Sequence, residues 1–95
     1  MQTFMVVATI RADTDMQAFG SLVPSEVAAV ERLRAAGALG AVHISFPRRV
    51  VFIEAFADFE EAARETVLSL PMGPFFDLDV FETGPAGVPG GPIVP

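Results

Sequence analysis

The sequence predicts an α+β fold in which one antiparallel sheet carries two helices on a single face. Four apolar runs rich in β-branched or aromatic residues, at 4–10, 41–46, 50–56 and 75–81, each have the length of a strand. Two segments with helical periodicity separate the first run from the second and the third from the fourth. The chain has 95 residues, which is room for one domain with one small core.

The first half of the chain predicts a strand followed by a helix. The strand covers Phe4 to Ile10 and ends at the polar segment 11–15. The helix runs from Pro24 to Ala36, because proline is accepted in a first turn and Gly37 is a typical stop residue. Residues 16–23 fit either an earlier helix or a loop.

The middle of the chain predicts a β-hairpin. The strands 41–46 and 50–56 flank Pro47-Arg48, which is short enough for a two-residue turn. In that register His43 pairs with Phe52 and Ala41 pairs with Glu54.

The second helix is predicted to start at Asp58 and to end before Pro71. Asp58 is placed to cap it, and Glu61 follows three residues later as in a capping box. One helical face is expected to carry Phe59, Ala63, Val67 and Leu70.

This β-α-β-β-α-β order is the ferredoxin-like arrangement, which leaves one face of the sheet open. The chain is 52% hydrophobic and has nine Phe, more apolar surface than one small sheet hides. We therefore expect self-association as a dimer or higher oligomer through that face. The domain is expected to span residues 1–83, and 84–95 to form a Gly/Pro-rich tail, since eight of these twelve residues are Gly or Pro.

Composition argues against several classes of partner. The net charge of −6 has the wrong sign for nucleic acid or for an anionic membrane surface. With no cysteine and one histidine, no metal site is expected, and without a glycine-rich nucleotide motif no cofactor is expected. No apolar run approaches the ~20 residues that span a bilayer, and the expected location is the cytoplasm.

Glu26 is the first candidate functional residue. At about 100° per residue, it falls on the same stripe of the first helix as Leu33 and Val30. A carboxylate on an apolar face is costly unless partnered, and a pKa raised by burial suits proton transfer near neutral pH. The alternative is that Glu26 satisfies free N–H groups in the first turn of its own helix.

A second set of candidates follows from strand alternation. His43, Ser45 and Glu54 share one face of the hairpin, and Thr9, Arg11 and Asp77 are expected on the same open face. Together they would form an acid/base pocket, with His43 as the second catalytic group and the other polar residues as substrate ligands. Phe52 and Phe75 are the aromatic residues expected to line it. The alternative is a polar subunit interface or a solvated face.

The segment Leu70-Pro71-Met72-Gly73-Pro74-Phe75-Phe76-Asp77-Leu78-Asp79-Val80 resembles the L-P-x-x-P-[FY]-x-D-[IL]-[DE]-V segment of the muconolactone delta-isomerase family. The similarity extends from Phe4 to Val80, with matches at Asp15-Met16, Glu26, Glu31-Arg32-Leu33 and Gly37. It implies a dimeric αβ barrel, in which two ferredoxin-like sheets pack face to face. It also implies a cofactor-independent 1,3-proton shift in an unsaturated lactone, with Glu26 at the position of the helix-borne glutamate.

The sequence departs from the family in its second strand. The family has Trp, Arg and His side chains there that suit an anionic lactone acid, whereas this chain has Leu39-Gly40-Ala41-Val42-His43-Ile44-Ser45. Arg48 and Arg49 lie in the turn and need not replace them. The leading hypothesis is an isomerase acting on a lactone or related aromatic-derived small molecule. The alternatives are a polyketide-type cyclase or cofactor-free monooxygenase, and a non-catalytic small-molecule-binding or assembly domain.

Overall fold

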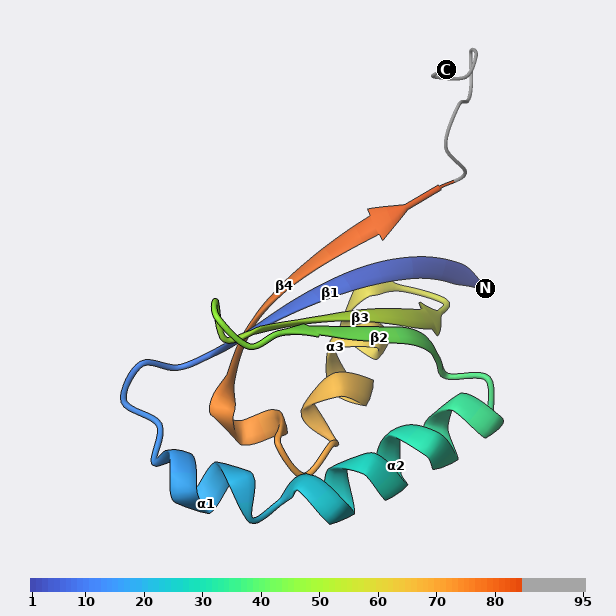
Figure 1. The fold of residues 1–95 in the computed structure, drawn as a ribbon. Helices are drawn as coiled ribbons and strands as arrows, with labels where there is room; N and C mark the ends of the chain where they lie inside the picture. Colours follow the sequence, from blue (N-terminus) through green and yellow to red (C-terminus); the bar gives the residue numbers. More distant parts are fainter. Residues whose placement is uncertain (85–95) are drawn as a thin grey trace.

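The computed structural model describes residues 1–84, which form one four-stranded antiparallel sheet with all helices beneath one face (Figure 1). The strand order is β2-β3-β1-β4, with every neighbouring pair antiparallel. The elements are β1 (Gln2–Ile10), α1 (Met16–Gly20), α2 (Val23–Ala35), β2 (Leu39–Ser45), β3 (Val50–Ala57), α3 (Glu60–Leu68), a 3₁₀ turn (Gly73–Phe75) and β4 (Phe76–Thr83). The predicted α+β, ferredoxin-like fold is confirmed. Apart from Gly84, the predicted tail lies outside the described residues.

The core lies between the sheet and the helices. Alternate residues of β1 (Phe4, Val6, Ala8 and Ile10) face the helices and are almost completely buried. Helix α3 packs onto them through Ala63 and Val67, neither of which is exposed. In helix α2 only Ala29 is almost completely buried, while Val30 and Leu33 pack against the core and stay partly exposed.

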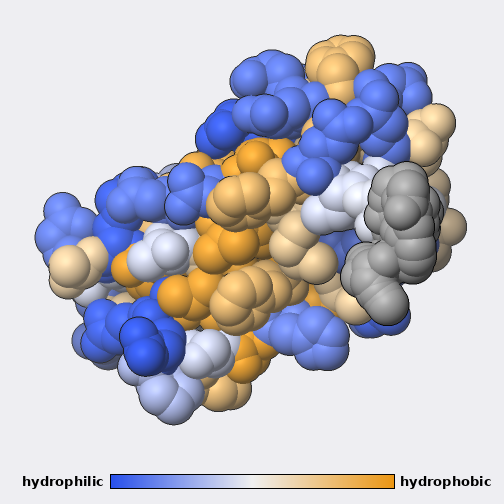
Figure 2. All heavy atoms as spheres, turned by 90° about the horizontal axis from the view of Figure 1, so that it is seen from above, coloured by the Kyte–Doolittle hydropathy of each residue, from blue (hydrophilic) through white to orange (hydrophobic). Residues whose placement is uncertain are grey.

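The open face of the sheet has an apolar centre. Figure 2, which looks down on this face, shows a hydrophobic band between polar margins. The register brings Val7 beside Phe52, and Met5 beside Phe81, on the side away from the helices. Phe52 and Phe81 are 40% and 54% exposed, unusual for phenylalanine in an isolated domain.

The hairpin has the predicted register at its closed end, where His43 pairs with Phe52. The Ala41–Glu54 pair is not formed, because the ladder shifts between Leu39 and Val42. The Glu54 carboxylate instead accepts a hydrogen bond from the Ala41 N–H, at 3.0 Å, and satisfies the group that the irregularity leaves unpaired. A Cβ on Gly40 would meet the Glu54 carboxylate and the tip of the Phe56 ring, so a larger residue there would displace these two side chains.

The start of the second helix differs from the prediction. Phe59, with an extended backbone, precedes α3, and no side chain caps the helix. Asp58 is therefore not the cap, and its carboxylate lies 3.9 Å from the N-terminal ammonium group. Because Phe59 precedes the first helical turn, it does not share the buried face of Ala63 and Val67 and is 60% exposed.

Residues 16–20, within the segment for which the sequence fits either a helix or a loop, form the short helix α1. The Asp15 carboxylate accepts hydrogen bonds from the N–H groups of Gln17 and Ala18, at 3.0 and 3.3 Å, and so caps it. Across residues 1–84 no helix combines the length and apolar character needed to cross a membrane.

Candidate functional site

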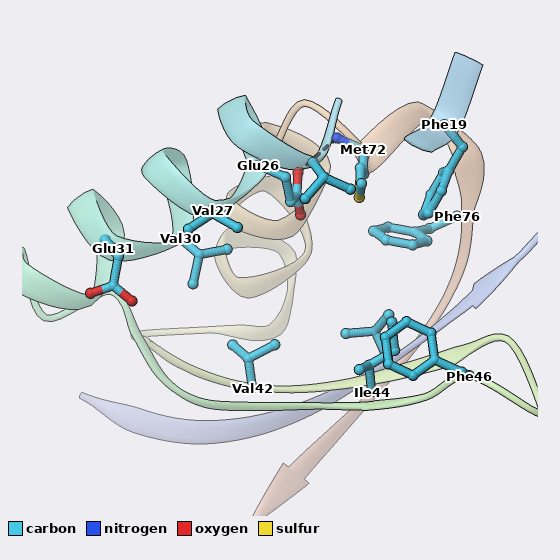
Figure 3. A pocket seen from close by; sticks show the side chains of 12 residues that line it. Phe19, Glu26, Val27, Val30, Glu31, Val42, Ile44, Phe46, Met72 and Phe76 are labelled. Atoms are coloured by element: carbon cyan, nitrogen blue, oxygen red, sulfur yellow. Dashed lines mark hydrogen bonds between the residues drawn. The ribbon is translucent and has the colours of Figure 1, made fainter. Parts of the chain in front are cut away.

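A cavity of about 340 Å³ lies on the helix side of the sheet, between α2 and strands β2 and β3 and beside α1 (Figure 3). It lies where Ala29 is the only α2 residue that is almost completely buried, and where the β2 side chains Val42 and Ile44 are incompletely covered. The volume is within the usual range for small-molecule sites. Ten of the twelve lining residues are apolar and two are carboxylates: Phe19, Val23, Glu26, Val27, Val30, Glu31, Val42, Ile44, Phe46, Val51, Met72 and Phe76.

Glu26 occupies one wall of this cavity. It is half-buried in the first turn of α2, and its Oε1 accepts a hydrogen bond from the Met72 N–H at 2.9 Å (Figure 3). Burial raises the pKa of the Glu26 carboxyl above its ordinary value, and the hydrogen bond from Met72 acts against this rise without cancelling it. The carboxylate thus joins α2 to a distant segment, and no side chain caps the N-terminus of α2 itself.

The segment that follows α3 positions the Met72 N–H. A Cβ on Gly73 would lie 2.3 Å from the Leu68 carbonyl oxygen and 2.9 Å from the Leu68 Cα, so only glycine lets the chain double back against the end of α3. Met72 and Phe76, on either side of this turn, are both buried and both line the cavity. The proline-rich signature in the sequence therefore builds one wall of the site.

The structure does not bring His43 and Glu26 together within one chain. His43 is exposed on the open face of β2, whereas its neighbours Val42 and Ile44 line the cavity on the other side of the sheet. The predicted shared face is nevertheless observed for most of the polar set, since alternation and register place Thr9, Ser45, Phe52, Glu54 and Asp77 on the side of His43.

Two predicted ligands have structural contacts at the start of β4. The Arg11 guanidinium donates hydrogen bonds to the carbonyl oxygens of Phe76, at 3.3 Å, and Pro74, and it lies 4.0 Å from the Asp77 carboxylate. Phe75 packs edge-on against Phe19 with 5.6 Å between ring centroids. Phe75 therefore contacts Phe19, a cavity residue, but does not line the cavity itself. The next residue, Phe76, lines it instead.

Three cavity residues, Phe19, Met72 and Phe76, are not predicted by the sequence patterns. Phe19 belongs to α1, whose existence was undecided, and the position of Met72 depends on the turn at Gly73. The alternation of Phe76 with Asp77 in β4 was a usable signal for Phe76, because it puts these two side chains on opposite faces. Within residues 1–84 no three His, Asp or Glu side chains gather closely enough to hold a metal ion.

No known protein-family model matches this chain, and no curated protein sequence matches it. Among solved structures, a crystal structure of muconolactone isomerase is similar, with a TM-score of 0.68 and 23% sequence identity. The match covers 94% of this chain and 93% of the other chain. It confirms, as a shared fold over nearly the whole length, the resemblance found in the sequence.

Proposed function

We propose that this protein is a cofactor-independent isomerase that shifts a carbon-bound proton within an unsaturated lactone or a related small aromatic-derived metabolite. The observation that supports it best is Glu26, the half-buried carboxylate at the wall of an otherwise apolar cavity. The similarity in fold to muconolactone isomerase is consistent with the proposal.

The surroundings of Glu26 suit a group that takes up a proton and returns it. A pKa raised toward neutrality makes the carboxylate a stronger base, and its conjugate acid still gives the proton back readily. The Met72 N–H holds Oε1, while Oε2 accepts no hydrogen bond from any group in residues 1–84 and is free to face a ligand. One carboxylate can remove a proton from one carbon and deliver it to another on the same face of the ligand, with no net oxidation.

Glu26 alone carries the chemical step in this proposal. The sheet lies between His43 and the cavity, so the proposal gives His43 no part in the proton transfer. The apolar band around Phe52 shares the open face of the sheet with the polar residues His43, Thr9, Ser45, Glu54 and Asp77. We propose this face as the dimer interface of an αβ barrel.

Proton exchange tests the proposal. Purified protein is incubated in D₂O with an unsaturated γ-lactone or a cyclic enone, and deuterium incorporation is followed by mass spectrometry. Glu26→Gln keeps the size of the side chain and an oxygen for Met72, so exchange should fall by about 10²–10⁴-fold while the fold remains.

The matched control is Glu31→Gln, which removes the other carboxylate of the same cavity. Glu31 is exposed and lies 3.5 Å from Arg34, so its loss should leave exchange within a few-fold of the original rate. Equal losses in the two variants would refute the assignment. Ligand binding with no exchange at all would favour the binding-domain alternative, and consumption of oxygen would favour the monooxygenase.

A further inference from the structure

A second hollow adjoins the cavity of Glu26. Its volume is about 240 Å³, and the two hollows share four lining residues, Phe19, Val23, Ile44 and Phe46. Beyond these it is lined by Ile10, Met16, Gly20 and Arg49. The joined hollows therefore extend from Glu26 on α2 to the turn between β2 and β3. Among the described residues that line either hollow, Arg49 is the one cation.

The backbone of Arg49 is left-handed, with φ of 55°, and no other non-glycine residue of the described chain has a positive φ. This conformation follows from the turn, since the Arg49 N–H donates to the Phe46 carbonyl at 3.2 Å and the Arg49 carbonyl accepts from the Ile10 N–H at 3.0 Å. Glycine or asparagine would fill such a position with less strain. The turn explains the conformation but gives no reason for an arginine side chain.

The guanidinium of Arg49 is available for a ligand. Arg11, Arg34 and Arg64 each lie within 4.0 Å of a carboxylate. Arg49 makes no ion pair and no side-chain hydrogen bond with any of residues 1–84. The planar guanidinium presents several N–H donors beside an apolar hollow. This arrangement suits a ligand in which a planar oxyanion is attached to an apolar body.

We propose that Arg49 binds the carboxylate of an elongated apolar organic acid whose body fills the joined hollows and whose far end reaches Glu26. The inference deepens the proposed function by naming the substrate class of that site, and it rests on the proposed function for the role of Glu26.

The test compares binding of an acid and of its neutral isostere. Isothermal titration of the full chain with biphenyl-4-carboxylate and with biphenyl-4-carboxamide should show tighter binding of the acid. Arg49→Gln should weaken binding of the acid about tenfold, the scale of one charge-assisted hydrogen bond. Affinity for the amide should stay within about twofold of the original value, because the apolar contacts remain.

Arg48→Gln is the matched control. It removes the same charge from the adjacent turn position, and Arg48 lines neither hollow. Its affinity for the acid should remain within about twofold of that of the unmodified protein. Arg49→Gly relaxes the left-handed backbone, so it should lose the same affinity while unfolding at no lower temperature. This variant keeps the test decisive even if Arg49→Gln folds poorly.

The proposal is overturned if Arg48→Gln and Arg49→Gln weaken acid binding equally, if the amide binds as tightly as the acid, or if neither probe binds at millimolar concentration. Binding is measured without turnover, so the result is independent of the exchange assay. Selection of the acid by Arg49 together with unchanged exchange in Glu26→Gln would retain the ligand class and reject the isomerase.

Discussion

Replacement of Gly73 by alanine is expected to be one of the most damaging small changes in this chain. The new Cβ would lie 2.3, 2.7 and 2.9 Å from the O, C and Cα atoms of Leu68, all of them backbone atoms. Ordinary carbon contacts begin near ~3.5 Å, so the turn and the end of α3 must separate by roughly 1 Å. Overpacking of this kind costs about 1–3 kcal/mol, and we expect the upper end because no flexible side chain can move aside.

The consequence should be visible in stability and at the site. In a domain of this length, about 3 kcal/mol corresponds to a fall in Tm of more than ~10 °C. The Met72 N–H, next to the displaced residue, should also lose its bond to Glu26 and exchange faster with solvent. Urea denaturation, thermal melting and amide hydrogen exchange measure these effects.

Gly20→Ala is the control for this prediction. Gly20 is the last residue of α1, and a Cβ there would meet nothing within 4 Å. Alanine should therefore leave stability unchanged or raise it by up to about 1 kcal/mol, because it favours helix. If Gly73→Ala unfolds within about 1 kcal/mol of the unmodified protein, the reasoning about the turn is wrong.

Three further predictions concern Glu26 and the open face. Glu26→Ala should lower the free energy of unfolding, measured by urea denaturation, by about 1–3 kcal/mol, because it leaves the N–H of buried Met72 without a partner. Glu26→Gln should lower it by less than ~1 kcal/mol. Equal losses in the two variants would contradict this prediction. Because folding raises the pKa of Glu26, the contribution of Glu26 to stability is full below the ordinary pKa of about 4.5. It is lost as the pH rises through the folded pKa. Urea denaturation at a series of pH values should therefore show that the unmodified protein loses stability relative to Glu26→Gln as the pH rises from the ordinary to the folded pKa. A gain in relative stability over this interval would refute the direction of the pKa shift. Phe52→Glu should convert an oligomer to a monomer in light scattering and leave the circular dichroism spectrum unchanged. Phe59→Glu, which changes a still more exposed side chain outside this face, should leave the oligomer intact. An oligomer in both variants would exclude this interface.

The strand register near the closed end of the hairpin could be predicted because short loops leave few alternatives. The pairing of His43 with Phe52 follows from the loop length and from the alternation of buried residues. The irregularity at Gly40 could not be predicted, since a glycine in a strand does not reveal which partner will fill the space. The prediction of Asp58 as a cap failed because the helix begins after Phe59, and boundaries are set by packing as much as by local sequence.

The location of the cavity depended on information that no local pattern contains. Helical periodicity placed Glu26 on the inner face of α2, which is where the structure has it. Strand alternation sorted the sheet residues into two sets, but it did not show which set faces the cavity. That depends on how far α2 stands from β2, and hence on Ala29 and on the turn at Gly73. Arg49 lines the second hollow from a turn position with a left-handed backbone, which the residue type arginine does not predict.

The alternation of side chains in β2 has a consequence for how this protein can vary. Val42 and Ile44 face the cavity, while His43 and Ser45 face the opposite surface, so under the proposed function neighbouring residues should control different properties. Substitutions at 42 and 44 should alter ligand preference and leave assembly unchanged, and substitutions at 43 and 45 should do the reverse. The deletion of one residue from β2 would exchange the two sets at once. Directed evolution of this scaffold therefore tolerates changes of residue type in β2 far better than changes of its length.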